Sequence, residues 1–198
     1  LTGYAGQLSL AQYAIGGLGA LVAARLVADE NWPAELAFIA GAAFAIVVGA
    51  AFAIPALRTR GVNLAVVTLG LGFAVEQVVF NNPFFTGDFG SVTSIGRTEV
   101  LGWDVSSAEH PDRYLVVCLA VFVLSALVVA NVRRSSWGRR LIAVRSNERA
   151  AASLGISVFG AKLYAFSVAA AIASFAGTLL AFKDTTVVYN RFASFESI

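Results

Sequence analysis

The sequence predicts an all-α fold, a polytopic transmembrane helical bundle of about five spans, with one short helix outside the membrane. Hydrophobic residues make up 58% of the chain and charged residues only 13%, whereas a soluble domain is about one quarter charged. Five apolar runs approach the roughly 20 residues that a helix needs to cross a bilayer. Most of the positive charge is concentrated in a single polar segment, residues 131–159. Together these features indicate an integral membrane protein.

The five apolar runs are separated by short polar segments. The predicted spans are residues 8–27, 36–57, 62–80, 114–130 and 161–182. The first ends near Arg25, the second carries Pro55 near its end, and the fifth begins next to Lys162. The chain contains no Met and opens within an apolar pattern. We therefore expect residues 1–198 to form a single transmembrane domain that is a segment of a longer chain.

The segment 131–159 fixes the predicted topology. Its charge is almost entirely positive and comes from Arg133, Arg134, Arg139, Arg140, Arg145 and Arg149, against Glu148. Short loops beside membrane helices keep Lys and Arg on the cytoplasmic side, so this loop is predicted to be cytoplasmic. The alternation of spans then places the Arg-rich turn 58–61 inside and the acid-leaning segments 29–35 and 81–113 outside. Residues 1–7 fall inside or within the membrane, and residues 183–198 outside.

A short helix is predicted within this loop. Asn147 is a good N-cap residue, and the helix dipole favours an acid such as Glu148 in the first turn. Three alanines follow at 150–152, and Gly155 can adopt the left-handed conformation that ends a helix. A helix of about two turns is not stable alone in water. It is therefore expected to pack on the membrane surface or on a partner protein.

Small residues recur at one-turn spacing in two of the spans. They are Gly41, Ala45 and Gly49 in the second span, and Ala169, Ala173 and Gly177 in the fifth. Such stripes let helix backbones approach closely in lipid. We interpret them as helix-packing surfaces and assign them no role in binding a solute.

Two polar features at membrane depth admit a functional and a structural interpretation. Glu76 is the one acid inside a predicted span, and burying its charge in hydrocarbon would cost about 3 kcal/mol or more. It either lies on a translocation path or forms hydrogen bonds near the outer interface. Gln7 and Ser9 lie in a Gly-rich segment at the start of the chain. Irregular backbone there would border a cavity, while a plain helix N-terminus at the surface is the alternative.

The sequence offers no pattern typical of an enzyme. It contains no nucleophile elbow, no metal-ligand spacing and no G-x-x-x-x-G-K-[ST] phosphate loop. His110 is the single histidine and is expected to be a surface residue rather than a metal ligand. Because spans flank the Arg cluster, anionic lipid headgroups and a cytoplasmic partner are favoured over nucleic acid as its contacts.

Three blocks resemble a known family. They are LTGYAGQLSLAQYAIGGLGA, LRTRGVNLAVVTLGLGFAVEQVVF followed by TGDFG, and WGRRLIAVRSNERAAASLGISVFGAKLYAFSVAAAIASFAGTLLA. Together they are similar to the permease subunits of branched-chain amino-acid ABC importers, the LivM-like group. The resemblance covers most of the chain except residues 90–113.

This resemblance implies that residues 148–154 form the coupling helix, which docks on a separate ATP-hydrolysing subunit. The pattern is similar to the E-A-A-x-x-x-G signature of importer permeases. The residues it assigns to ATPase coupling are Glu148, Arg149, Ala150, Ala151 and Gly155. Arg149 stands where the signature has its acid, and Glu148 comes one position early. Ala151 is expected in the docked face, and the translocation path is expected to include Gln7, Ser9 and Glu76.

The resemblance further implies a transport subunit rather than an enzyme, in a bacterial or archaeal cytoplasmic membrane. The chain itself would bind no cofactor, and ATP with Mg²⁺ would bind the partner ATPase. The implied partners are ABC ATPase subunits, a second permease subunit, a soluble substrate-binding protein and membrane lipids. Three alternatives remain open: import of urea, a short amide or another small polar solute by the same fold, an ion-coupled secondary transporter that uses Glu76, and a membrane anchor without a transport route.

Overall fold

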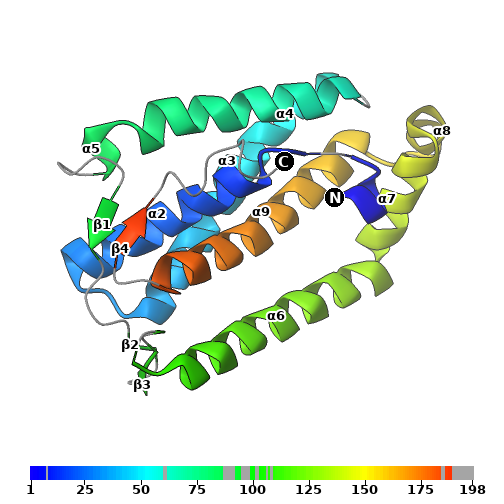
Figure 1. Cartoon of the computed structure of the whole chain (residues 1–198). Coiled ribbons are helices and arrows are strands. Elements are labelled where there is room, and N and C mark those ends of the chain that lie inside the picture. The colour runs from blue at the N-terminus through cyan, green and yellow to red at the C-terminus, as the bar shows by residue number, and fades with distance from the viewer. Residues whose placement is uncertain are drawn as a thin grey trace.

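The computed structural model describes residues 1–7, 9–59, 62–86, 92–94, 99–100, 103–105, 107, 109–183 and 186–188. The helices are α1 Thr2–Ala5, α2 Gln12–Glu30, α3 Ala34–Arg58, α4 Val62–Val75 with its π-helical continuation η1 Glu76–Phe80, α5 Pro83–Thr86, α6 Pro111–Arg134, α7 Ser136–Ser146, α8 Glu148–Ser153 and α9 Val158–Lys183. Four short strands accompany them: β1 Val92–Ser94, β2 Glu99–Val100, β3 Trp103–Asp104 and β4 Thr186–Val188. The predicted all-α bundle is confirmed (Figure 1). The strands were not predicted, and they are confined to one end of it.

The centre of the molecule is a group of three helices, α2, α3 and α9, each of which packs on the other two. Glycine makes these crossings possible. A Cβ on Gly177 of α9 would lie 2.2 Å from the carbonyl oxygen of Gly16, and one on Gly41 of α3 would lie 2.6 Å from that of Gly19. No side chain fits at either position. The interpretation of the small-residue stripes as packing surfaces is confirmed.

Among the residues that the structure describes, four segments are long and apolar enough to cross a membrane: Ala34–Pro55, Asn63–Phe80, Pro111–Arg134 and Val158–Lys183. They correspond to the second to fifth predicted spans. The first predicted span corresponds to α2, which begins at Gln12, not at residue 8. Ten of its residues are buried, and most of these are Gly and Ala. Because α2 faces other helices instead of lipid, it needs less apolar surface than the other four.

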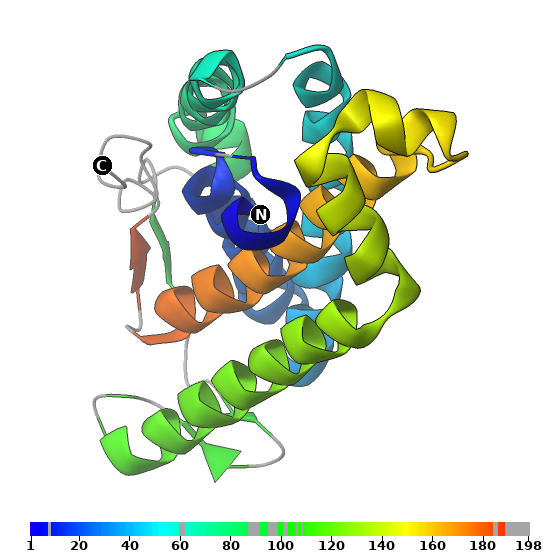
Figure 2. The same cartoon turned by 90° about the vertical axis from the view of Figure 1, so that its right-hand side faces the viewer.

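The loops gather at two opposite ends, as the charge pattern predicted. At one end β1 pairs with β4 in antiparallel register, which joins the loop after α4 to the segment after α9. There the Ser107 hydroxyl also donates to the carbonyl oxygen of Lys183 at 2.5 Å. At the other end α1 packs on α7, and α8 packs on α7 in turn (Figure 2). The segments predicted to be cytoplasmic thus share one end of the bundle, and those predicted to lie outside share the other.

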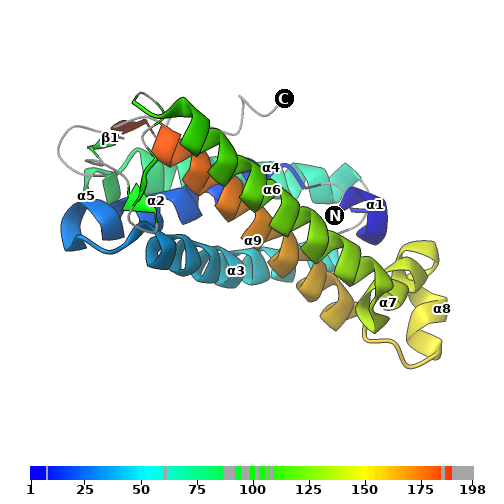
Figure 3. The ribbon, with the colours of Figure 1, turned by 90° about the horizontal axis from the view of Figure 1, so that it is seen from below.

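Helix α6 lies along one side of the bundle (Figure 3). None of its 24 residues is buried. An apolar pocket of about 440 Å³ separates it from α3 and α9. The Tyr114 hydroxyl donates to the carbonyl oxygen of Leu179 at 2.7 Å and ties one end of α6 to α9. The outer faces of α6 are therefore available to lipid or to another polypeptide.

The basic segment 131–159 contains more helix than was predicted. Helix α6 continues to Arg134, and α7 fills the next eleven residues. The Ser135 hydroxyl starts α7 because it accepts a hydrogen bond from the Gly138 N–H at 3.3 Å. All six arginines of this segment are exposed, as a solvated cytoplasmic loop requires. Residues 60–61 of the predicted Arg-rich turn and 87–90 of the T-G-D-F-G motif lie outside the described residues.

Candidate functional site

Helix α8 has six residues and is capped at both ends. The Asn147 side-chain oxygen accepts hydrogen bonds from the N–H groups of Arg149 and Ala150, at 3.0 and 3.1 Å. At the other end Gly155 has a φ of 79°. The Gly155 N–H donates to Ala152 O and the Ile156 N–H to Ala151 O, both at 3.0 Å. This pair of bonds is a Schellman motif. The N-cap and the helix-ending glycine predicted from the sequence are both confirmed.

One face of α8 packs on the chain itself. Ala151 is only 2% exposed and belongs to a cluster with Leu141, Val144, Ala161 and Ala165 of α7 and α9. The expectation that Ala151 lies in the docked face is therefore wrong. In so short a helix one face must be buried to hold it in place, and the small side chain of Ala151 allows the close approach to α7 and α9.

The opposite face of α8 is open. It consists of Ala150, Ala152 and Ser153 together with the C-cap residue Leu154, all exposed. Leu154 is 79% exposed, which is a high value for an apolar side chain. Sequence reasoning did not single it out. No signal in the sequence indicated it, because its exposure depends on how α8 packs on α7 and α9.

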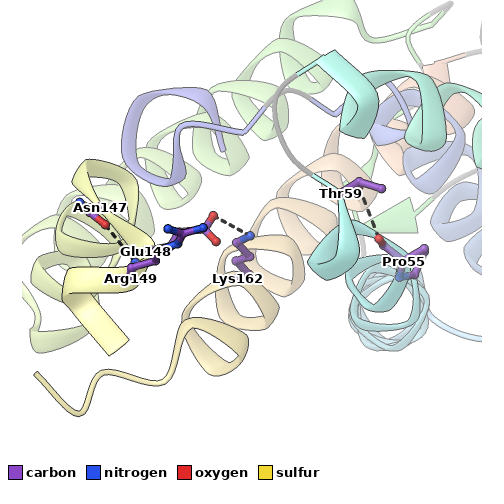
Figure 4. Close-up of polar contacts among 6 residues, drawn as sticks. All are labelled: Pro55, Thr59, Asn147, Glu148, Arg149 and Lys162. Atoms are coloured by element: carbon purple, nitrogen blue, oxygen red, sulfur yellow. Dashed lines mark hydrogen bonds and ion pairs between the residues drawn. The ribbon is translucent and has the colours of Figure 1, made fainter. Parts of the chain in front are cut away.

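A buried ion pair connects α8 to α9. The Lys162 ammonium lies 2.8 Å from a Glu148 carboxylate oxygen (Figure 4). The Lys162 side chain is 2% exposed and that of Glu148 is 23% exposed. A lysine is almost never fully buried without a partner, so Glu148 is what permits Lys162 to be inside. This pair was not predicted. The signal that could have indicated it is the combination of one lysine at the start of an apolar helix with one acid in a basic loop.

A polar pocket of about 280 Å³ opens next to this ion pair. Its lining brings together the segment before α2, the turn after α3, the start of α4, the α7–α8 junction and the start of α9. The residues are Ala5, Gly6, Gln7, Thr59, Leu64, Val144, Arg145, Ser146, Asn147, Glu148, Arg149 and Lys162. Thr59 lies just past Pro55 and α3, across from α8 and α9 (Figure 4). Two sets of residues that were predicted separately, Gln7 of the translocation path and the coupling residues Glu148 and Arg149, thus border one cavity.

The segment before α2 has an irregular backbone. Helix α1 ends at Gly6, which has a φ of 63°, and the described residues from 6 to 11 are not helical. The Leu10 N–H donates to the hydroxyl of the buried Thr68 at 3.0 Å. Gln7 is 8% exposed. Non-helical backbone is tolerated within a membrane protein where it is buried or lines a cavity, and Gln7 borders the polar pocket. That this segment borders the transport route stays a prediction.

The three residues predicted for a translocation path do not meet at one site. The Ser9 hydroxyl accepts from Gln12 at 3.4 Å and borders an apolar pocket beside Tyr164. Glu76 is half-buried and opens η1, at the far end of α4 from the polar pocket. Its carbonyl oxygen accepts from the Asn81 N–H at 3.0 Å. Short π-helical segments are frequent at functional sites. The path itself stays a prediction.

The structure also places Asp104, Glu109 and His110 together, with one ligand atom of each within 4.8 Å of the others. The sequence spacing did not predict this neighbourhood. Exposed acidic groups commonly gather without a metal, and Glu109 is exposed. The cluster lies at the predicted outer end of the bundle, away from α8. We assign it no function.

The chain is similar in sequence to known proteins. The sequence profile of one family, described as "Branched-chain amino acid transport system / permease component", matches residues 1–197. Two curated relatives are each named high-affinity branched-chain amino acid transport system permease protein LivM, one from Salmonella typhimurium and one from Escherichia coli K12. Each is 36% identical over 163 residues, covering 72% of this chain and 38% of the relative.

The chain therefore spans well under half of the length of these relatives. No solved structure shows a significant match to it. The family profile covers nearly the whole chain, and the helices of the bundle have the length and apolarity that spanning a membrane several times requires. The chain belongs to the family of permease components of branched-chain amino-acid transport systems and is a multi-pass membrane protein.

Proposed function

We propose that this chain is the membrane-spanning part of an ATP-driven importer that moves branched-chain amino acids across a bacterial or archaeal cytoplasmic membrane. The proposal rests on the family match and on the geometry of α8. A soluble binding protein delivers the solute to the outer face, and a second permease subunit completes the route. ATP and Mg²⁺ bind separate ATPase subunits. This chain performs no covalent chemistry.

The observation that carries the proposal is the two-sided construction of α8. Its outer face, with Leu154 79% exposed, is open to a partner. Its inner face is fixed to the bundle by the Ala151 cluster and by the Glu148–Lys162 ion pair. A short helix of this kind can couple a partner to the bundle, because a displacement of its outer face is transmitted directly to α9.

The route of coupling follows from the packing. Closure of the ATPase subunits around ATP displaces α8, and Lys162 carries the displacement into α9. Helix α9 contacts α2 and α3 through glycine crossings that leave little slack. ATP shifts the bundle between outward-open and inward-open arrangements only to the extent that the closed ATPase binds one arrangement better. The proposal therefore requires that α8 occupy different positions in the two states.

The test is uptake by reconstituted vesicles that contain the full-length permease with its partner subunits. We expect uptake of leucine, isoleucine and valine that needs both ATP and the binding protein. Uptake driven by an ion gradient without ATP would instead indicate a secondary carrier. Uptake of urea or a short amide in place of amino acids would change the solute but keep the mechanism. A complete complex that transports no member of such a panel would leave an anchoring role.

A further inference from the structure

The polar pocket is the cavity of the molecule that is best suited to a small charged ligand. It lies at the predicted cytoplasmic end, and its lining comes from five separate parts of the chain. At about 280 Å³ it is near the lower end of the size range of small-molecule sites. The other described pockets around α6 and α9 have mainly apolar side chains.

The pocket carries an excess of positive charge. Arg145, Arg149 and Lys162 line it, against one acid, Glu148. Lys162 is paired with Glu148, and Arg145 donates to the carbonyl oxygen of Gly3. The guanidinium of Arg149 makes no hydrogen bond or ion pair within the described part of the chain. Arg149 therefore has all five of its N–H donors available for a carboxylate.

The pocket also contains a buried acceptor without a donor. The side-chain oxygen of Gln7 accepts no hydrogen bond from any described residue, although the side chain is more than nine-tenths buried. An unsatisfied buried polar group costs about 1–3 kcal/mol. A ligand that brings an N–H group would remove this cost. The pocket thus offers cations for a negative group and an acceptor for a positive one.

We propose that the polar pocket binds a zwitterionic α-amino acid on the cytoplasmic side. The carboxylate is bound by Arg149, with Arg145 beside it, and the ammonium group donates to Gln7. The specific solute class rests on the proposed function. Inorganic phosphate, the other small anion suited to the arginines, offers mainly acceptors and leaves Gln7 unsatisfied. The ammonium group is therefore what distinguishes the ligand.

A solute bound in the polar pocket would inhibit transport. It would contact Gln7, which precedes α2, and Arg149 on α8, next to the ion pair that joins α8 to α9. These are the parts whose relative movement the coupling route requires. The bound solute stabilises one of their arrangements, so its accumulation in the cytoplasm slows further import.

The test measures binding of radiolabelled leucine to the complete complex in nanodiscs, without ATP or the binding protein. Three competitors separate the chemistry: 4-methylpentanoate lacks the ammonium group, 3-methylbutylamine lacks the carboxylate, and inorganic phosphate tests for a general anion site. We expect leucine to bind, and we expect the affinity of each competitor to be at least tenfold lower than that of leucine. Equal competition by 4-methylpentanoate or phosphate would overturn the proposal, as would the absence of leucine binding.

Variants assign the binding to this pocket. Gln7→Leu removes the acceptor and should weaken leucine about tenfold, the effect of one charge-assisted hydrogen bond. Gln77→Leu, the same change at an exposed residue in η1, should have no effect. Likewise Arg149→Gln should weaken binding and Arg139→Gln, outside the pocket, should not. Unchanged affinity in both Gln7→Leu and Arg149→Gln would place the bound leucine elsewhere and contradict the proposal.

A second Gln7 variant covers the case in which Gln7→Leu misfolds. Gln7→Glu keeps the shape of the side chain but adds a negative charge. It should therefore raise the affinity for 3-methylbutylamine relative to the affinity for 4-methylpentanoate. An unchanged ratio of the two would also contradict the proposal. These binding measurements contain neither ATP nor the binding protein, so their outcome is independent of the uptake experiments. Zwitterion binding without ATP-dependent uptake would refute the proposed function alone.

Discussion

At the scale of single residues, Lys162 is the least expected feature of the molecule. It is buried at the start of an apolar helix and paired with Glu148 at 2.8 Å. The two partners differ in what they can do alone. The Glu148 side chain is 23% exposed and can turn to water, whereas that of Lys162 is only 2% exposed. Loss of either partner therefore has a different consequence.

The pair predicts an unequal double-mutant cycle. Glu148→Gln leaves a buried, unpaired ammonium and should loosen α8 severely, because breaking a buried pair costs about 3 kcal/mol or more. Lys162→Met should be milder, because Glu148 can be hydrated. The double variant should return close to the parent, because replacing both charges is often nearly neutral. The measurement is the rate of trypsin cleavage after Arg149 in nanodiscs, which reports the opening of α8.

The control for this cycle is Glu30→Gln, the same change at an exposed residue at the end of α2. It should leave the cleavage rate after Arg149 at the parent value. Additive effects of Glu148→Gln and Lys162→Met would contradict the coupling between the two side chains.

Glu76 gives the second prediction at this scale. Glu76→Gln keeps the shape of the side chain and removes its charge. If the carboxylate lies on the solute path, uptake should fall on the order of tenfold at normal expression, since a charge-assisted hydrogen bond contributes about 1.5 kcal/mol or more. Uptake kinetics in vesicles check this. Parent-like kinetics would assign Glu76 to the structure of η1, where its carbonyl oxygen already accepts from Asn81.

The residue-scale features that could be predicted are those governed by local rules. The capping role of Asn147 and the left-handed Gly155 depend on a few neighbouring residues, and both are confirmed. The Lys162–Glu148 pair and the burial of Ala151 depend on how α8 and α9 meet. No periodicity in the sequence encodes that meeting, which explains why Ala151 was placed on the wrong face.

At the scale of elements, α8 depends on its caps because six residues cannot form a stable helix alone. Asn147→Ala removes the acceptor of two hydrogen bonds and should destabilise α8 by about 1 kcal/mol. Asn147→Asp keeps the acceptor and serves as the matched control. Hydrogen exchange of the Arg149 and Ala150 amides measures the effect. Equal protection in the Ala and Asp variants would show that the cap contributes nothing.

The two faces of α8 predict two separable defects. Leu154→Asp places a charge on the open face and should reduce copurification of the ATPase subunit at least tenfold, while trypsin cleavage after Arg149 stays at the parent rate. Ala151→Asp buries an unpaired carboxylate against α7 and α9 and should accelerate that cleavage. Leu154→Ala, which shortens the side chain without adding charge, should have an intermediate effect on copurification. Normal ATPase binding by Leu154→Asp would contradict the assigned docking face.

The elements that the sequence predicted correctly are those with a strong apolar signal. The second to fifth spans are found within four residues of their predicted ends. Helix α7 was missed because its five polar or charged residues interrupt the apolar ones, so that it gives no membrane signal, and because its start depends on the Ser135 cap. The start of α2 was placed four residues early because Leu10 and Ala11 continue the apolar pattern without being helical.

At the scale of the whole molecule, the core and the periphery are built differently. Helices α2, α3 and α9 pack through glycine and alanine, while α6 buries no residue and exposes large apolar side chains along its length. An apolar helix with open faces is stable in lipid or against another protein. The outer faces of α6 are therefore suited to lipid or to another polypeptide.

The topology was predicted from charge alone, and the structure supplies an independent check. Pairing of β1 with β4 and contact of α1 with α7 group the loops into the same two sets that the positive-inside pattern requires. Neither contact depends on charge. The structure shows which loops lie together, while the Arg-rich composition of 131–159 predicts which group faces the cytoplasm.

The orientation predicts a labelling experiment on intact cells. Cys118 is the single cysteine of the chain, so Cys118→Ala gives a background for single introduced cysteines. Ser153→Cys on the open face of α8 should resist a membrane-impermeant maleimide until the membrane is permeabilised. Glu30→Cys, equally exposed but at the opposite end of the bundle, should react in intact cells. Reaction of Ser153→Cys with the reagent in intact cells would show that the protein has the opposite orientation in the membrane. An ATPase in the cytoplasm could then not reach α8, and the proposed coupling would be refuted.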